Sequence, residues 1–176
     1  MNKLLEYVYE IEDTTIRRMA CLAIEIIPEY FWKVPASSSG KYHPSFSVKE
    51  GGLLNHTTFG LDLIKDLSNI SIKIQKFKDK ATLAYMLHDT FKYGDTNEGS
   101  KHTNKLHPKI ASEKYRYLWE ENGFPEELIN EICNAIESHM GQWDFGGKLR
   151  SPETDLDRFV HLVDYIASRK FLDKYW

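Results

Sequence analysis

The 176-residue sequence contains little cysteine and no long apolar run. Its two cysteines, Cys21 and Cys133, exclude a disulfide framework, and we expect both to be small buried side chains in a reducing compartment. No apolar run approaches the roughly 18 residues that cross a bilayer, and the first residues contain too many acids for a signal peptide. We therefore expect an intracellular, cytoplasmic protein with no membrane contact.

A strong charge of one sign is also missing. Lys and Arg number 23 against 26 for Asp and Glu, which gives a net charge of −3. This balance argues against long nucleic acid as a partner, because a protein that binds it usually presents a basic surface.

Polar–apolar alternation, internal repeats and linkers are absent, and apolar residues instead recur at helical spacing. The sequence predicts one all-α domain over residues 1–176. Its helices are expected at about 4–11, 14–27, 53–67, 78–93, 108–122, 125–139 and 155–170. Two long polar loops, 94–106 and 141–154, are unusual in a compact domain unless functional, so we expect them to border a site.

The stretch "ATLAYMLHDTFKYG", residues 81–94, places Asp89 after an apolar run. A buried carboxylate without a partner costs several kcal/mol. Asp164, within the apolar "VHLVDYIASR", raises the same problem. Histidines stand within or at the ends of the expected helices: His56, His88, His107 and His139. Two carboxylates and several imidazoles on helices of one small domain suit a metal site, since a cation offsets the buried charge.

Three motifs occur in a fixed order: "GGLLNHT" at 51–57, "LHDTFK" at 87–92 and "VDYIASR" at 163–169. This order of a histidine, a histidine–aspartate doublet and a distant aspartate resembles the HD-domain superfamily of metal-dependent phosphohydrolases. The flanking "KYHPSF" and the later "SHMG" are most similar to small bacterial and phage HD proteins and to the HD module of certain 3′-to-5′ exoribonucleases. The resemblance implies a helical bundle whose metal-binding core spans 41–170, preceded by N-terminal helices in 1–35.

The resemblance also implies a centre of one or two divalent ions (Mn, Fe, Co, Ni or Zn), which imidazole and carboxylate ligands suit. The expected ligands of the first ion are His56, His88, Asp89 and Asp164. A second ion is expected at His107 and His139, with the Asp89 carboxylate bridging. Met140 follows His139 where many two-metal members carry another histidine, so the number of ions stays open.

In such a centre a metal-activated hydroxide attacks phosphorus in line with the leaving oxygen. We assign catalytic roles to Asp89 and Lys92. Lys92 lies three residues after Asp89, so it can reach a phosphate oxygen; the alternative is a solvated cation at a helix C-terminus. Lys41 and His43 are expected to contact the substrate together with Lys92, although an ordinary polar loop explains the first two equally well.

Further residues receive structural roles. His102 is expected in an exposed loop, and it is the alternative metal ligand if His107 is not one. His161 is expected to pack behind Asp164 on the same helix face. The aromatic residues of "SEKYRYLW" are expected in the core and not in a base-stacking surface: Tyr115, Tyr117 and Trp119.

The implied activity is hydrolysis of a phosphomonoester or phosphodiester bond in a small phosphorylated substrate, in the first place a nucleotide. One alternative is a 3′-to-5′ nuclease that acts on short single-stranded RNA or DNA, against which the negative net charge argues. The other is a catalytically silent nucleotide-binding regulatory module. The presence of every core ligand argues against the silent form.

Overall fold

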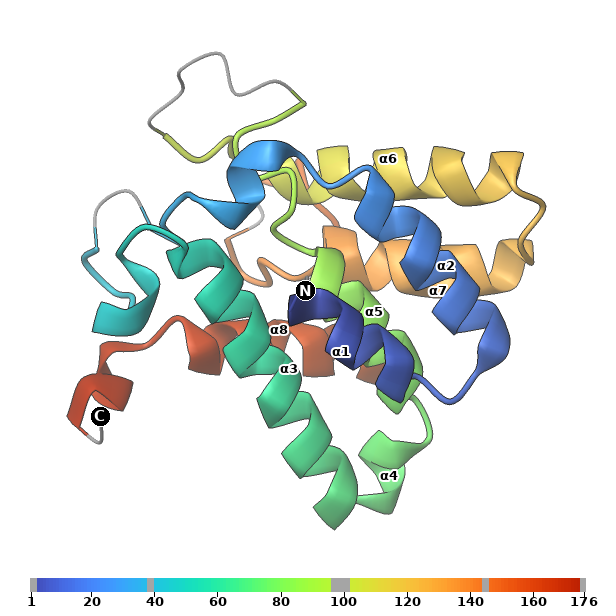
Figure 1. Cartoon of the computed structure of the whole chain (residues 1–176), viewed down its shortest axis with the longest axis horizontal. Coiled ribbons are helices and arrows are strands. Elements are labelled where there is room, and N and C mark those ends of the chain that lie inside the picture. Colours follow the sequence, from blue (N-terminus) through green and yellow to red (C-terminus); the bar gives the residue numbers. More distant parts are fainter. Residues whose placement is uncertain (1–2, 38–39, 96–101, 144–145, 175–176) are drawn as a thin grey trace.

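The computed structural model describes residues 3–37, 40–95, 102–143 and 146–174. Helices form all the regular secondary structure of this part of the chain, which contains no β-strand, and the predicted all-α fold is confirmed (Figure 1). The α-helices are α1 (Lys3–Glu10), α2 (Thr14–Glu25), α3 (Gly52–Ile70), α4 (Ile72–Gln75), α5 (Lys78–Leu87), α6 (His107–Glu121), α7 (Glu126–Glu137) and α8 (Asp155–Ala167). Short 3-10 turns are η1 (Glu29–Trp32), η2 (Ser45–Ser47) and η3 (Lys170–Lys174).

Local signals in the sequence fix several helix starts. The Asp13 side chain caps α2 by accepting from two backbone N–H groups of its first turn. Pro108 lies in the first turn of α6, where its missing N–H costs no helical hydrogen bond. At α8, the Thr154 hydroxyl accepts from the Asp157 N–H at 3.1 Å, and the Asp157 carboxylate accepts from the Thr154 N–H at 3.0 Å. This reciprocal pair is a capping box.

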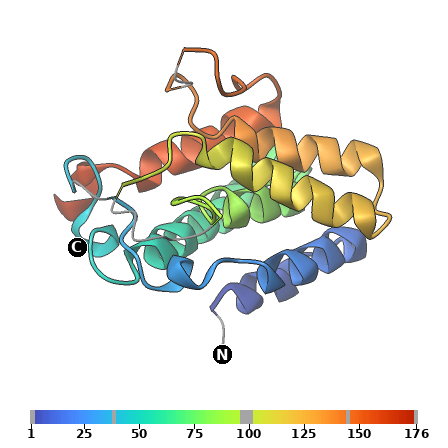
Figure 2. The same cartoon turned by 90° about the horizontal axis from the view of Figure 1, so that it is seen from above.

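Helix α5 lies in the middle of the bundle. The antiparallel helices α1 and α2 cover it from one side, and α7 and α8 lie on the other (Figure 2). Helix α3 packs along α5, and α6 pairs with α7. This arrangement encloses α5 almost completely, as its sequence requires, because it presents no polar face between Ala81 and Leu87.

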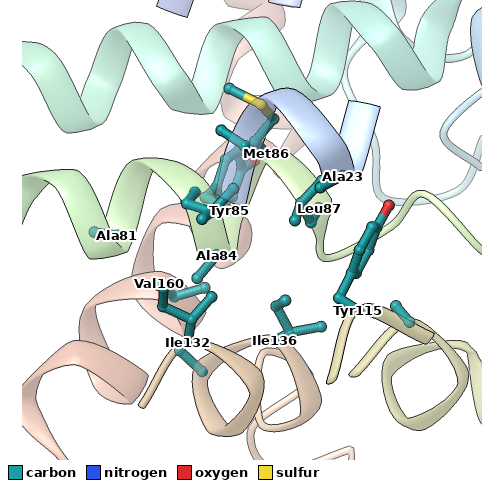
Figure 3. Packing of buried hydrophobic residues seen from close by; sticks show 14 of the residues in the cluster. Ala23, Ala81, Ala84, Tyr85, Met86, Leu87, Tyr115, Ile132, Ile136 and Val160 are labelled. Carbon is teal, nitrogen blue, oxygen red and sulfur yellow. The ribbon is translucent and has the colours of Figure 1, made fainter. Parts of the chain in front are cut away.

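The hydrophobic core surrounds α5. Every residue from Ala81 to Lys92 is buried, and the apolar ones pack against Ile132 of α7 and Val160 of α8 (Figure 3). The core is continuous from α1 to α8. The same buried segment therefore continues from apolar residues directly into the His88–Asp89 doublet.

The end of α5 differs from the predicted one. The helix ends at Leu87, and the residues up to Tyr93 form successive turns in place of the last helical turns. At this end the Tyr85 carbonyl oxygen accepts from the His88 backbone N–H and lies 2.5 Å from His88 Nδ1. The other predicted helices are present with shifted ends, and the short α4 was not predicted.

Two predictions of burial are wrong. Cys133 is buried but Cys21 is exposed, because it lies off the apolar stripe of α2. Tyr115 and Trp119 are buried, whereas Tyr117 is 67% exposed. Tyr117 lies two residues from each of them and therefore faces the opposite side of α6. No helix among the described residues combines the length and apolar character that a membrane span requires.

Candidate metal centre

Helix ends bring the predicted metal ligands together at one end of the bundle. His56 lies in the first turns of α3, and Asp164 lies in the last turn of α8. The start of α3 packs closely against the backbone of Ser47. Glycine is required at position 52, because a Cβ there would lie 2.2 Å from the Ser47 carbonyl oxygen. The remaining ligand candidates directly follow or begin helices: His88 and Asp89 after α5, His107 at the start of α6, and His139 after α7.

One hydrogen-bond pattern recurs at His88, His107 and His139. In each imidazole, Nδ1 lies next to the backbone carbonyl oxygen of the residue three positions earlier, at 2.5, 2.7 and 2.8 Å respectively. A carbonyl oxygen only accepts, so Nδ1 must carry the proton. Each Nε2 then points into the cluster, which is the ring orientation of a metal ligand.

The Asp89 carboxylate is the centre of one group of these atoms. Its Oδ1 lies 2.8 Å from His107 Nε2 and 3.7 Å from His139 Nε2. Its Oδ2 lies 2.5 Å from Lys92 Nζ and 3.7 Å from His88 Nε2. Burial acts to raise the pKa of Asp89, but the positive charges of Lys92, His88 and His107 outweigh it and hold the pKa well below its usual range.

Asp164 is the centre of the second group. Its Oδ1 lies 3.0 Å from His56 Nε2 and 3.5 Å from His88 Nε2. Burial again acts to raise the pKa of the carboxyl group, but the nearby His56 and His88 imidazoles outweigh it and hold the pKa well below the usual value. His88 thus lies between two ionised carboxylates, and they raise its pKa against the effect of its own burial. The pocket favours positive charge at this point.

The arrangement fits a divalent cation. Ligand atoms of His56, His88 and Asp164 lie within 4.8 Å of one another, and so do those of His88, Asp89 and His139. The buried Nε2 of His88 has no hydrogen-bond partner among the described residues. The Nε2 atoms of His107 and His139 lie 3.3 Å apart and both lie near Asp89 Oδ1. A divalent cation at this point would take both nitrogen atoms and the carboxylate oxygen as ligands.

The His139 imidazole is neutral at neutral and mildly acidic pH. Burial lowers its pKa to about 3, and positive charge at His88 and His107 acts in the same direction. A neutral imidazole offers its lone pair to a metal without first losing a proton. The electrostatics therefore suit metal binding at neutral pH.

Comparison with known families agrees with this geometry. A family model described as HD domain matches residues 53–169. The chain belongs to the HD domain family. HD domains are metal-dependent phosphohydrolases that bind divalent ions, and the match contains every predicted metal ligand. Comparisons with curated proteins and with solved structures give no match.

A cavity of about 530 Å³ opens onto the metal-ligand cluster of this HD domain. Asp89, His107, His139 and Asp164 line its inner wall. The volume lies in the range of small-molecule sites, so the cluster is accessible to a ligand of nucleotide size.

The structure separates the predicted substrate-binding residues. Lys92 and His43 line the cavity, and the His43 and His56 ring centroids are 5.8 Å apart. Lys41 is not among the described residues of the cavity wall, and its ammonium group lies 5.1 Å from the Tyr42 ring centroid. Contact between Lys41 and a substrate stays a prediction.

The two remaining histidines lie where the sequence indicated. His102 is exposed, although residues 96–101 of its loop lie outside the described part of the chain. His161 packs behind the cluster, and its Nδ1 lies 2.7 Å from the His139 carbonyl oxygen. The contact is possible only because residue 141 is glycine, since a Cβ there would lie 2.2 Å from the His161 ring.

Sequence reasoning missed three residues near the centre. The Tyr85 hydroxyl lies 3.4 Å from His56 Nε2, and burial raises its pKa well above the usual value, so the group stays protonated. Trp143 and Arg169 also line the cavity. Arg169 is the last residue of the motif "VDYIASR", and Trp143 lies in a loop expected to border the site. The sequence therefore contained a signal for each of these two residues.

Proposed function

We propose that this protein hydrolyses a phosphate ester of a small nucleotide-type substrate, with the His/Asp cluster holding one or two divalent ions. The observation that carries the proposal is the arrangement of two metal-ligand groups that share His88 and adjoin a cavity of about 530 Å³. A structural cluster buried away from solvent would have no such access.

The donor atoms divide into two sets. His56, His88 and Asp164 would hold one ion, and Asp89 with His107 and His139 would hold another. Nitrogen and carboxylate oxygen donors favour Mn²⁺, Fe²⁺, Co²⁺, Ni²⁺ or Zn²⁺. When bound, such an ion supplies Lewis acidity toward a phosphoryl oxygen and a nucleophile at neutral pH.

Lys92 has a role of its own in this proposal. It is only 7% exposed, lines the cavity and lies 2.5 Å from Asp89 Oδ2. The ammonium group holds the Asp89 carboxylate in place and keeps further N–H donors for a ligand. Facing the cavity from a buried position, it would donate to a phosphoryl oxygen whose negative charge increases in the transition state.

Substrate size follows from the charges on the cavity wall. Among the described residues of the wall, the permanent cations are Lys92 and Arg169. Two cations suit one or two phosphate groups, whereas a long polynucleotide needs many more phosphate contacts. A small nucleotide or a short phosphodiester is therefore the proposed substrate class.

The test combines elemental analysis with a substrate screen. Purified protein is expected to contain a first-row divalent metal, to lose turnover after EDTA treatment and to regain it with Mn²⁺, Co²⁺ or Ni²⁺. The screen contains nucleoside mono-, di- and triphosphates, cyclic dinucleotides, dinucleotides and generic phosphodiesters. Absence of metal together with absence of turnover after metal addition would overturn the proposal. Progressive shortening of a long oligonucleotide, weakening steeply with salt, would favour the nuclease.

A further inference from the structure

Two aromatic rings and one cation gather at one side of the cavity: Trp143 and Arg169 line it, and Tyr165 packs against both. Trp143 comes from the 141–154 loop, Tyr165 from α8, and Arg169 follows α8. The Trp143 and Tyr165 rings are nearly parallel, at 12°, with centroids 6.3 Å apart. The guanidinium carbon of Arg169 lies 3.7 Å from the Tyr165 centroid and 5.5 Å from that of Trp143. Both rings therefore hold the guanidinium in place.

Arg169 retains a donor for a ligand. Its Nε is buried and has no hydrogen-bond partner among the described residues. A buried N–H without an acceptor costs free energy, and a planar guanidinium suits a phosphate group. Because Arg169 lines the cavity, an anion that enters the cavity can supply the missing acceptor.

Trp143 offers a different kind of contact. It lines the same cavity, yet 43% of the residue is exposed. An indole that lines a cavity and stays partly exposed suits a planar ring, and stacking on it accepts any of the nucleobases. A phosphorylated ligand without a base would leave this surface uncovered.

We propose that Trp143 and Arg169 form a nucleotide-binding subsite of the cavity, in which the nucleobase stacks on the indole and the guanidinium donates to the phosphate of the same ligand. Tyr165 is a positioning residue that orients the guanidinium. This proposal rests on the proposed function, because it names the part of the substrate that the metal centre does not recognise. The ligand class is a nucleoside monophosphate, and a bare sugar phosphate is discriminated against.

Calorimetric titration of EDTA-treated protein tests the subsite without turnover. The ligands are the four ribonucleoside 5′-monophosphates, ribose 5-phosphate and adenosine. The variants are Trp143→Leu, Trp143→Phe and Arg169→Gln. Tyr117→Leu is the matched control, because Tyr117 is an exposed aromatic residue on α6 outside the cavity. Melting temperatures of all variants separate loss of binding from loss of folding.

Each change should affect one part of the ligand. Nucleotides should bind at least about fivefold more tightly than ribose 5-phosphate, since base stacking contributes on this scale. Trp143→Leu should remove that difference, Trp143→Phe should retain most of it, and Tyr117→Leu should not alter it. Arg169→Gln should weaken nucleotides and ribose 5-phosphate by a similar factor and leave adenosine unchanged.

Equal affinity for nucleotides and ribose 5-phosphate, or no binding of any of the four nucleotides, would overturn the subsite. A Trp143→Leu variant that has a lower melting temperature but binds the nucleotides as tightly as the parent would also overturn it. Trp143, Tyr165 and Arg169 would then only pack the 141–154 loop against α8. The outcome is separate from that of the hydrolysis screen. Base-dependent binding without turnover would support the subsite and contradict the proposed hydrolysis. Turnover that is unchanged in Trp143→Leu would support the hydrolysis and contradict the subsite.

Discussion

The buried segment 81–92 passes through two regions that are equally enclosed but differ in how their polar groups are satisfied. In the apolar core, the Trp119 Nε1–H donates to the Met19 carbonyl at 3.1 Å, and the hydroxyls of Thr90 and Tyr115 lie 2.8 Å apart. At the His/Asp cluster, His88 Nε2 has no hydrogen-bond partner among the described residues, and the Nε2 atoms of His107 and His139 lie 3.3 Å apart.

The difference shows what each region is for. A core is stable when every buried polar group has a partner. The cluster keeps two carboxylates beside His88 Nε2, which has no hydrogen-bond partner among the described residues, and this arrangement suits a bound cation. Substitutions in the core should therefore change stability alone, and substitutions in the cluster should change metal binding first.

The largest effect is expected for Asp89→Asn, which keeps the shape and removes the charge. Loss of a central ligand should lower metal occupancy and turnover together, the latter more than about 100-fold. The melting temperature of the metal-free protein should fall, because the buried Lys92 ammonium group loses its ion-pair partner. Metal analysis beside thermal denaturation tests this, and retained metal in a less stable protein would assign Asp89 to the core.

Ile132→Ala tests the other region. Ile132 is fully buried against α5, so the variant should lose about 2–5 kcal/mol of unfolding free energy in urea titrations. Metal content per folded molecule should not change. The same substitution at Ile72, which is 78% exposed, is the control and should cost less than about 0.5 kcal/mol. Loss of metal from folded Ile132→Ala would show that the two regions are coupled.

His161→Ala addresses the support of the cluster. The His161 Nδ1–H donates to the carbonyl of His139, so its loss should loosen the His139 imidazole without removing a ligand. Metal affinity should fall about 10-fold, the lower end of the effect of such supporting contacts. Competition with a metal chelator measures this, and His102→Ala serves as the exposed control. Unchanged affinity would restrict the role of His161 to packing.

The smallest effect is expected for His43→Asn, which changes how the stability of the protein depends on pH. Burial lowers the pKa of His43 to about 4, with contributions from His56 and Lys92, whereas the unfolded chain titrates near 6.5. Between pH 6.5 and 4 the unfolded state binds more protons, so this histidine lowers stability as the pH falls through that range. His43→Asn should flatten the stability profile of EDTA-treated protein there. Parallel profiles for both proteins would contradict this linkage.

Sequence patterns predicted the helices because apolar spacing and caps such as Asp13 are local signals. They also brought out the candidate ligands, because Asp89 and Asp164 stand conspicuously in apolar surroundings. The early end of α5 has no signal in the local sequence, because residues 88–93 contain no proline and no glycine. The subsite around Trp143 needs the fold as well, because a loop and the end of α8 meet only in three dimensions.

The most direct test of the central claim is anomalous diffraction from crystals grown with Mn²⁺, recorded near the manganese absorption edge. We expect a strong peak within about 2.0–2.3 Å of His88 Nε2 and of an Asp89 or Asp164 carboxylate oxygen. If both donor sets are filled, a second peak should lie roughly 3.5–4 Å from the first, beside His107 and His139. Peaks only at surface carboxylates, with the cluster bridged by hydrogen bonds alone, would contradict the metal centre.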